Sequence, residues 1–441
     1  MKAEKKRRYI YLYYALLLLV LASRQTATTP PSIVLRLAFM AAAIIPAILD
    51  KDVCYPAILT MFYTLSLDGF GYSYMPSTLS LYVIVTLVIA MFFSRNIKSG
   101  TIPIFILLFA LYIFLIDLLF GVTQYETVFF QRTFYCFLLI MGFLIISGRN
   151  NDGALLQLPL CFAVTTLVLS IAFLTHREQF VLTEIGDMER TGWTDPNYFG
   201  MALGMGTVIG MLKMFSGEWK SLSFVEKAIY IAAVVISVPT LALNASRGAM
   251  LSVVVGFVAL LLFSKAKLGS KIVFTTLSVI AVVYLYNNQY FELLEYRIYN
   301  DEGTGSGRTE IWAEKLSSFA EGNPLHMIFG YGHVKGSTIS GRHIGFHSDY
   351  IGFLVDYGFV GLGLLLYMLF YPIRIALKGS PEKPSVIVLI VYLAICFVTL
   401  EPLLTGIMAY FSFYMYALLL AKNSTQNKTY VKSKNIVPFH L

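Results

Sequence analysis

The strings Gly307-Arg308-Thr309-Glu310-Ile311-Trp312 and Gly345-Phe346-His347-Ser348-Asp349-Tyr350 mark the one long polar interruption of an otherwise apolar sequence. The interruption runs roughly from Phe291 to His347, and another apolar run follows it. Within it, residues Thr309 to Ala320 have the spacing of an amphipathic helix, with Trp312 on the apolar side. The pattern therefore predicts a long loop outside the membrane, containing a helix that lies at the membrane surface with Trp312 among the lipid headgroups.

The composition around this loop is that of a membrane protein. Hydrophobic residues make up 57% of the 441 positions and charged residues only 13%, whereas soluble domains are about a quarter charged. The apolar residues form runs near bilayer length, which predicts an all-α, polytopic helical membrane protein with about 12–14 transmembrane helices. The candidate spans are residues 9–23, 33–49, 53–67, 78–93, 101–120, 127–147, 154–175, 196–216, 227–244, 248–264, 272–290, 349–371, 385–400 and 403–421.

The basic residues divide unequally between the two sides of the membrane. If the N-terminus is cytoplasmic and the first helix is not cleaved, 22 of the 33 basic residues lie on the inner side, 17 of them lysine, as the positive-inside rule expects. Of the other eleven, nine are arginine. Because the guanidinium fork grips phosphate at two points, this bias favours phosphate recognition on the outer face. The alternative is arginines that snorkel or pair with outer carboxylates. The net charge of +8 follows from this topology and does not indicate a nucleic-acid partner.

The string from Arg190 to Tyr198 (Arg-Thr-Gly-Trp-Thr-Asp-Pro-Asn-Tyr) lies at the start of one apolar span. Pro196 suits the first turn of a helix and Asp195 suits its N-cap. The structural interpretation is therefore a helix start and nothing more. The functional alternative is that Arg190 and Asn197 contact a sugar or a phosphate.

Two further arginines, Arg247 and Arg308, are candidates for binding an anion. Arg247, in Asn244-Ala245-Ser246-Arg247-Gly248-Ala249, is held at the bilayer edge by a short connection, and a charge there indicates function. Arg308 follows Gly303, Gly305 and Gly307, which favour a mobile loop able to approach a phosphate.

His347 is the candidate general base. A neutral imidazole there can take a proton from an attacking hydroxyl while arginines hold the departing anion. Asp349 is a candidate to orient the ring, and His343 is the rival for the same role. A structural helix cap is the alternative for His347.

Metal binding is the competing chemistry for the same loop. His326, His333, His343 and His347 are dense, but the loop has no HExxH, cysteine pair or DxD. The four cysteines lie inside apolar runs, where small buried side chains are expected (Cys54, Cys136, Cys161 and Cys396). We therefore expect neither a metal nor another cofactor.

These strings, in this order, resemble the O-antigen ligase/polymerase superfamily of bacterial envelope enzymes. The similarity covers about residues 185–370. Its motifs are Arg190 to Asn197, Ser246-Arg247-Gly248, Gly307-Arg308 with Ile311-Trp312, Asn323-Pro324 with Gly330-Tyr331-Gly332, and His347-Ser348 with Gly358-Phe359-Val360-Gly361. The histidine of that family is commonly followed by asparagine, and Ser348 stands here instead.

The resemblance implies a metal-independent, inverting glycosyltransferase that acts on undecaprenyl-pyrophosphate-linked glycan at the periplasmic face of the bacterial inner membrane. By the same resemblance, Arg247 and Arg308 engage the pyrophosphate and His347 assists the acceptor. Arg190, Asn197, Trp312, His343 and Asp349 complete the expected substrate-binding set. Membrane lipids and a chain-length regulator are the further expected partners.

The expected organisation has three regions. N-terminal transmembrane helices occupy residues 1–175, and a catalytic core with outer loops 176–195 and 291–347 occupies residues 176–371. C-terminal helices and a basic tail occupy residues 372–441, with both termini cytoplasmic.

Three activities stay open. A polymerase joins lipid-linked repeat units and is favoured because many capsule and O-antigen loci share this architecture; a ligase transfers finished glycan to the lipid A core. A polysaccharide flippase or other transporter is the third, with Arg36 and Arg132 inside spans as its best support. Against it, the ionisable residues gather at one membrane face and no internal repeat is visible.

Overall fold

A computed structural model describes the parts of the chain that build the site. The described residues are 101–121, 158–175, 177, 181–185, 188–191, 196–300, 307–340, 345–377 and 383–401. The expected spans 9–23, 33–49, 53–67, 78–93, 127–147 and 403–421 lie outside them.

Every expected span within the described residues is confirmed as a helix. These helices are α5 (Thr101–Ile116), α8 (Leu158–Thr175), α9 (Pro196–Met214), α10 (Phe224–Asn244), α11 (Arg247–Phe263), α12 (Leu268–Asn287), α17 (Asp349–Ala376) and α18 (Lys383–Thr399). A π-helical turn, η1 (Asp117–Gly121), continues α5, and a 3-10 turn, η3 (Gly217–Ser221), follows α9. Among the described residues, α10, α12 and most of α17 are long and apolar enough to cross a bilayer, and several shorter apolar helices accompany them. The chain is a helical membrane protein.

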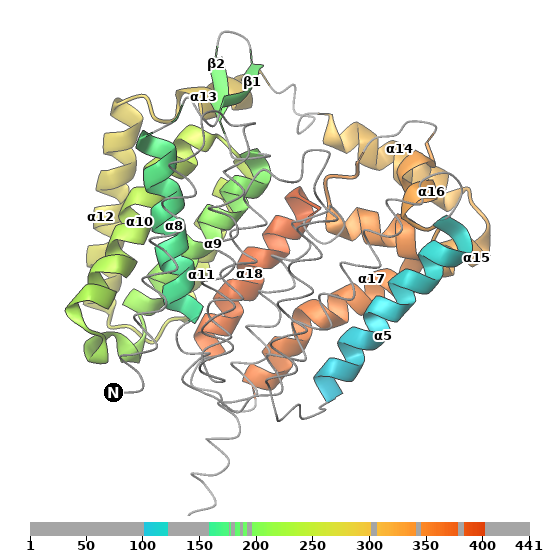
Figure 1. The fold of residues 1–441 in the computed structure, drawn as a ribbon, viewed down its shortest axis with the longest axis horizontal. Helices are drawn as coiled ribbons and strands as arrows, with labels where there is room; N and C mark the ends of the chain where they lie inside the picture. The colour runs from blue at the N-terminus through green and yellow to red at the C-terminus, as the bar shows by residue number, and fades with distance from the viewer. Residues whose placement is uncertain are drawn as a thin grey trace, which may run out of the picture.

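Helix α9 is the centre of the bundle. Almost all its residues are buried, because α8, α10 and α11 pack around it and α18 touches it. The Tyr392 hydroxyl of α18 donates to the Met201 carbonyl of α9, and Thr207 shares a 2.6 Å hydrogen bond with Ser237 of α10. Figure 1 shows α12 at the rim of this group, where Leu285 is its only buried residue.

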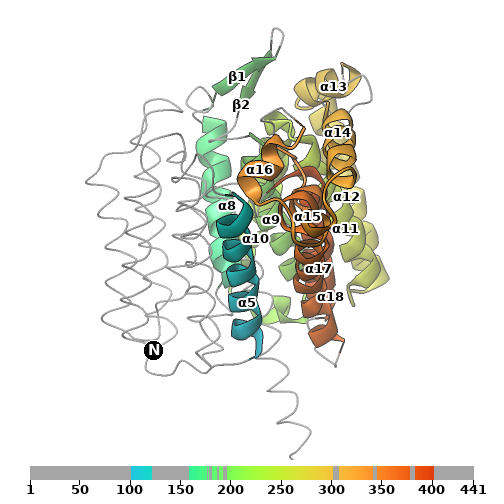
Figure 2. The ribbon, with the colours of Figure 1, turned by 90° about the vertical axis from the view of Figure 1, so that its right-hand side faces the viewer.

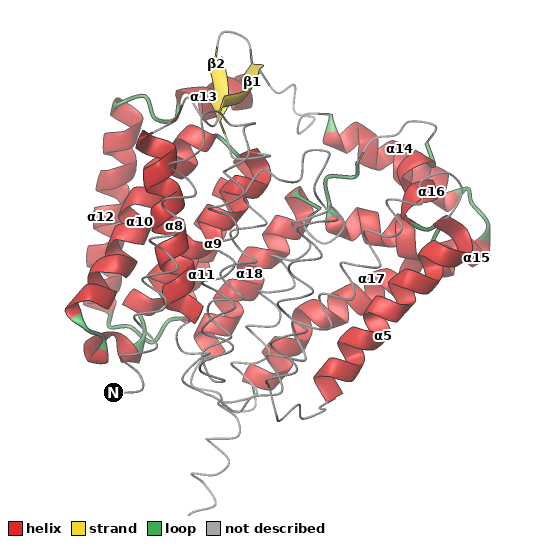
Figure 3. Ribbon diagram, in the orientation of Figure 1, coloured by secondary structure: helices red, strands yellow, loops and turns green. Residues whose placement is uncertain are grey.

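The two outer loops carry more structure than the sequence indicated. Strands β1 (Val181–Ile185) and β2 (Met188–Thr191) form an antiparallel hairpin inside the predicted loop 176–195. They are the only strands among the described residues (Figure 3). The described part of the interruption from Phe291 to His347 holds four helices: α13 (Glu292–Tyr299), α14 (Arg308–Ala320), α15 (Pro324–Phe329) and α16 (His333–Thr338).

The hairpin, α13, α14 and α16 lie at one end of the bundle, which we call the hairpin end (Figures 1 and 2). The connection between α11 and α12 lies at the opposite end. Helix α14 confirms the amphipathic helix predicted over Thr309–Ala320, but not the orientation of its tryptophan. The Trp312 indole donates to the Phe346 carbonyl over 2.6 Å and is half-buried against protein. The apolar side of α14 thus packs on the loop before α17, and the placement of Trp312 among lipid headgroups stays a prediction.

Helix α17 is broken at Gly358, whose φ of 67° and ψ of −171° are not helical. The break frees backbone carbonyls, and the segment between α15 and α16 satisfies them. The Tyr331 amide donates to Val355 O over 3.1 Å and the Gly332 amide to Asp356 O over 2.8 Å. The Tyr112 hydroxyl of α5 donates to Tyr357 O over 2.7 Å. The approach is so close that a Cβ on Gly358 would lie 2.3 Å from Ile328 O.

We predict that Gly358→Ala lowers the free energy of unfolding of the purified protein by about 1–3 kcal/mol. Alanine would have to adopt a positive φ, and its Cβ would clash with the Ile328 carbonyl oxygen. Gly363→Ala is the matched control in the same helix, since nothing lies within 4 Å of its Cβ position. The control should match or slightly exceed the native melting temperature. Equal melting temperatures for the two variants would contradict the assignment of the break.

Candidate functional site

The site is organised around the C-terminal end of α18. The last carbonyls of a helix have no partner within the helix, and here other segments provide the donors. Arg308 Nη1 donates to Thr399 O over 2.7 Å. A Cβ on Gly248 would lie 2.5 Å from Thr399 Oγ1, so the start of α11 is packed on the same residue. Thr399 therefore brings Arg308 and the residue next to Arg247 to one place.

The segment that carries His347 is fixed to the same helix end. Ser348 Oγ donates to Phe397 O over 3.2 Å, and the Asp349 amide donates to Leu400 O over 3.0 Å. His347 itself is exposed and has a φ of 52°. A positive φ is uncommon for a non-glycine residue and persists only where the surroundings hold it. The three predicted catalytic residues therefore share α18 as a common support.

Arg247 is placed by a second arginine that the sequence analysis did not single out as a site residue. Arg247 Nη1 donates to Arg297 O over 3.2 Å, and Arg297 Nη1 donates in turn to Ala245 O. Ala245 has a φ of 52° and ends α10. The α13 helix thus clamps the tight turn between α10 and α11. Asn197 supports the turn from α9, since Ser246 Oγ donates to its Oδ1 over 3.3 Å.

Arg247 and Arg308 also begin helices. Arg247 is the first residue of α11 and Arg308 the first of α14, and neither N-cap residue, Ser246 or Gly307, makes a side-chain capping bond. The first amides of a helix and its dipole favour negative charge. Each of these two arginines therefore stands at a helix N-terminus, a combination suited to an anion.

Glu401 is a site residue that the sequence analysis missed. Its side chain is 4% exposed, and its Oε2 lies 3.3 Å from the Cβ position of Gly345, two residues before His347. It is the only charged residue between Lys383 and Lys422. A carboxylate in an apolar stretch indicates function by default, so that isolation was the available signal.

The structure brings most of the predicted site residues together, but not all of them can be placed. Arg308 and the Asp349 amide bond carbonyls at the end of α18, and Ser348, the neighbour of His347, does the same. Gly248, the neighbour of Arg247, packs on Thr399, while the Arg247 side chain contacts Arg297. Asn197 contacts Ser246, and Trp312 contacts Phe346. Asp349 is fully buried. Arg190 lies in β2, where its backbone pairs with Thr183. His343 and Asp195 lie outside the described residues.

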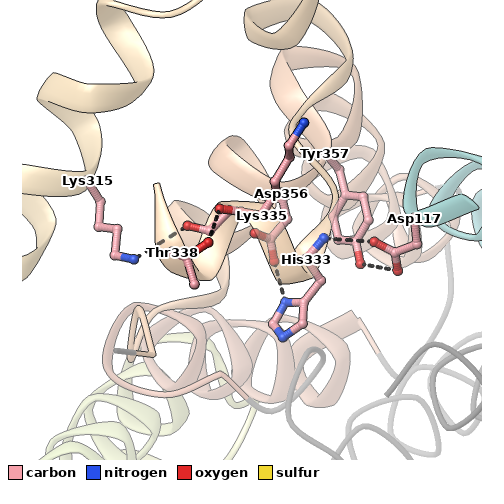
Figure 4. Close-up of polar contacts among 8 residues, drawn as sticks. Asp117, Lys315, His333, Lys335, Thr338, Asp356 and Tyr357 are labelled. Atoms are coloured by element: carbon pink, nitrogen blue, oxygen red, sulfur yellow. Dashed lines mark hydrogen bonds and ion pairs between the residues drawn. The ribbon is translucent and has the colours of Figure 1, made fainter. Parts of the chain in front are cut away.

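The loop histidines that are described have protein partners. His333 Nδ1 pairs with Asp356 Oδ2 at 2.6 Å (Figure 4). His326 stacks on Tyr331 with ring centroids 4.4 Å apart, and its Nδ1 lies 2.9 Å from Gly330 O. Within the described part of the chain, no group of three or more histidine, cysteine, aspartate or glutamate residues is arranged to hold a metal ion.

The segment that carries most of this site is similar to a known protein family. Residues 232–366 match the family model described as O-antigen ligase. This match supports the resemblance of the segment to the O-antigen ligase/polymerase superfamily. The match spans α11 to α16, most of α10 and the start of α17, and therefore includes Arg247, Arg297, Arg308 and His347. It supports a membrane enzyme of the glycan ligase or polymerase type. No curated protein matches the chain.

We predict that Arg297→Met loosens the turn that carries Arg247. The substitution keeps an apolar stem but removes the donor to Ala245 O, a charge-assisted bond whose loss costs about 1.5–3 kcal/mol. Hydrogen exchange followed by mass spectrometry should show faster exchange in residues 241–250 than in the native protein. Arg374→Met, at an exposed position in the last turn of α17, is the control and should leave that segment unchanged. Unchanged exchange in the Arg297 variant would contradict the clamp.

Proposed function

We propose that this protein polymerises undecaprenyl-pyrophosphate-linked oligosaccharide repeat units at the periplasmic face of the bacterial inner membrane. The observation that carries the proposal is that Arg308 and the His347 segment bond the end of α18, where Gly248, the neighbour of Arg247, also packs. A base beside paired guanidinium groups suits a transfer in which a hydroxyl attacks and a diphosphate departs. On this proposal residues 176–371 are the catalytic core.

In this proposal, Arg247 and Arg308 bind the pyrophosphate leaving group. A guanidinium carries five N–H donors in a planar fork, so one group can bond both a backbone carbonyl and a phosphate oxygen. Arg308 already holds the end of α18, which fixes the direction of its fork before a ligand arrives. Together with the starts of α11 and α14, Arg247 and Arg308 would stabilise the charge that grows on the pyrophosphate as the glycosidic bond breaks. No metal ion is needed for that step.

In this proposal, His347 is the general base that activates the acceptor hydroxyl. Its imidazole would take the proton of the acceptor hydroxyl as that oxygen attacks the anomeric carbon from the side opposite the pyrophosphate, which inverts the configuration. Trp312 holds the carbonyl of Phe346, the residue before His347. The hairpin with Arg190, the Asn197 helix start, His343 and Asp349 are the proposed surroundings of the glycan and its carrier.

The proposed orientation of the protein in the membrane rests on the positions of its lysines along the chain. Residues Lys213, Lys220, Lys227, Lys265, Lys267 and Lys271 flank the connections α9–α10 and α11–α12. The connection between α11 and α12 lies opposite the hairpin end (Figure 1). By the positive-inside rule the lysine-rich connections are cytoplasmic and the hairpin end is periplasmic. The lipid-linked glycan would then reach the site from the outer leaflet.

An O-antigen ligase is the second candidate, because the matching family model carries that description. It uses the same donor and the same leaving group, and differs only in the acceptor. Deleting the gene and separating the surface glycan on a gel distinguishes the two. Single repeat units on the lipid A core indicate a polymerase, and bare core with accumulated lipid-linked polymer indicates a ligase. Absence of all periplasmic lipid-linked glycan would contradict both and favour a flippase.

We predict that Arg247→Ala, Arg308→Ala and His347→Ala each reduce long-chain glycan by about 100-fold or more, as expected for loss of a charge-stabilising donor or a general base. Lysine at either arginine position should restore only part of the activity, because an ammonium lacks the fork. The measurement is glycan chain length in a deletion strain that expresses each variant, normalised to the amount of protein in the membrane. Near-normal glycan in all three alanine variants would refute the assignment of the site.

A further inference from the structure

Lys315 is a buried lysine in a helix that otherwise faces water on one side. Its side chain is 1% exposed, although lysine is almost never fully buried without partners. Burial lowers its pKa, and the carboxylates of Asp356, Glu314 and Glu401 partly oppose that change. Lys335, on the neighbouring α16, is exposed. Lys315 is therefore retained inside the protein against a solvation cost.

The ammonium of Lys315 lies between α16 and the segment before His347. Nζ donates to Gly336 O over 3.4 Å and lies 5.2 Å from the centroid of the Phe346 ring. An aromatic face attracts a cation, and more strongly where water is excluded. Figure 4 shows the Lys315 side chain directed from α14 toward α16. Because the side chain is enclosed, Lys315 does not itself touch a substrate.

Phe346 is held at two points from one face of α14. Its ring lies under Lys315, and its carbonyl accepts from Trp312 Nε1 over 2.6 Å. Residues three apart lie on the same side of a helix, so Trp312 and Lys315 act on Phe346 together. Phe346 is 1% exposed. The residue immediately before His347 therefore has a fixed ring and a fixed peptide group.

The wall opposite α14 is fixed by a separate polar network. His333 Nδ1 pairs with Asp356 Oδ2 at 2.6 Å, and the His333 amide donates to Asp117 Oδ1 over 2.8 Å. The Tyr357 hydroxyl donates to Asp117 Oδ2 over 3.2 Å. These bonds attach α16 to both α5 and the break in α17 (Figure 4). They hold the Gly336 carbonyl and the Asp356 carboxylate around the ammonium.

We propose that Lys315 is a positioning residue for His347, acting through Phe346. The positive φ of His347 needs support on both sides of the residue. Ser348 and Asp349 supply it on one side through α18, and Phe346 supplies it on the other through Lys315 and Trp312. This proposal rests on the proposed function, because it gives His347 the role of base.

The test compares Lys315→Met, Lys315→Arg and the matched control Lys335→Met in membrane vesicles supplied with the lipid-linked donor. We expect Lys315→Met to lower kcat by about 10–100-fold, since a small misplacement of a catalytic group has effects of this size. KM for the donor should stay within about twofold, because Arg247 and Arg308 are untouched. Lys315→Arg should recover most of the loss, and Lys335→Met should behave as the native protein.

A second variant keeps the proposal testable if Lys315→Met does not accumulate in the membrane. Phe346→Leu removes the ring and keeps an apolar side chain, and should show the same loss of kcat. The double variant Lys315→Met/Trp312→Phe should lose less than the product of the single losses, because both residues act on Phe346.

Three outcomes would overturn the proposal. Native kcat in Lys315→Met would do so, and so would a raised donor KM with unchanged kcat. Activity in His347→Ala would also overturn it, together with the role of His347 in the proposed function. If His347→Ala is inactive while Lys315→Met is fully active, only the positioning role of Lys315 fails.

Discussion

The carbonyl groups at the end of α18 are the constraint on which the site depends. A helix that ends inside the protein must find donors for its last carbonyls, because unpaired buried polar groups are strongly destabilising. Arg308, Ser348 and the Asp349 amide are those donors. The same bonds that complete α18 therefore bring an arginine and a histidine from distant parts of the sequence to one place.

The break in α17 also leaves backbone carbonyls that other segments must bond. Gly358 and Gly330 allow backbone to approach backbone, and amides from the α15–α16 segment occupy the freed carbonyls. Irregular backbone at a membrane boundary is tolerated where protein covers it. The break turns α17 so that its first residues reach α18, while the network of Asp117, His333 and Asp356 attaches the cover to α5. The described helices α14, α15 and α16 of the long polar interruption thus form a layer packed against α17.

Much of this could be predicted from the sequence because it depends on local patterns. Apolar runs predicted the helices within the described residues, and the hydrophobic spacing of residues 309–320 predicted α14. The hairpin over residues 181–191 was not predicted, since two short strands in a polar loop leave little periodicity. Glu401 and Arg297 were missed because their importance lies in the residues that they contact, and the bond of Trp312 to Phe346 was missed for the same reason.

The sequence by itself determined that the chain is a helical membrane protein that resembles the O-antigen ligase/polymerase superfamily. Hydropathy, charge and motif order are properties of the chain before it folds. Only the tertiary structure decided which groups meet at the end of α18, that Arg297 clamps the Arg247 turn, and that Lys315 points inward onto the Phe346 ring. Those relations depend on hydrogen bonds between residues 21 to 91 positions apart, and no local pattern encodes such pairings.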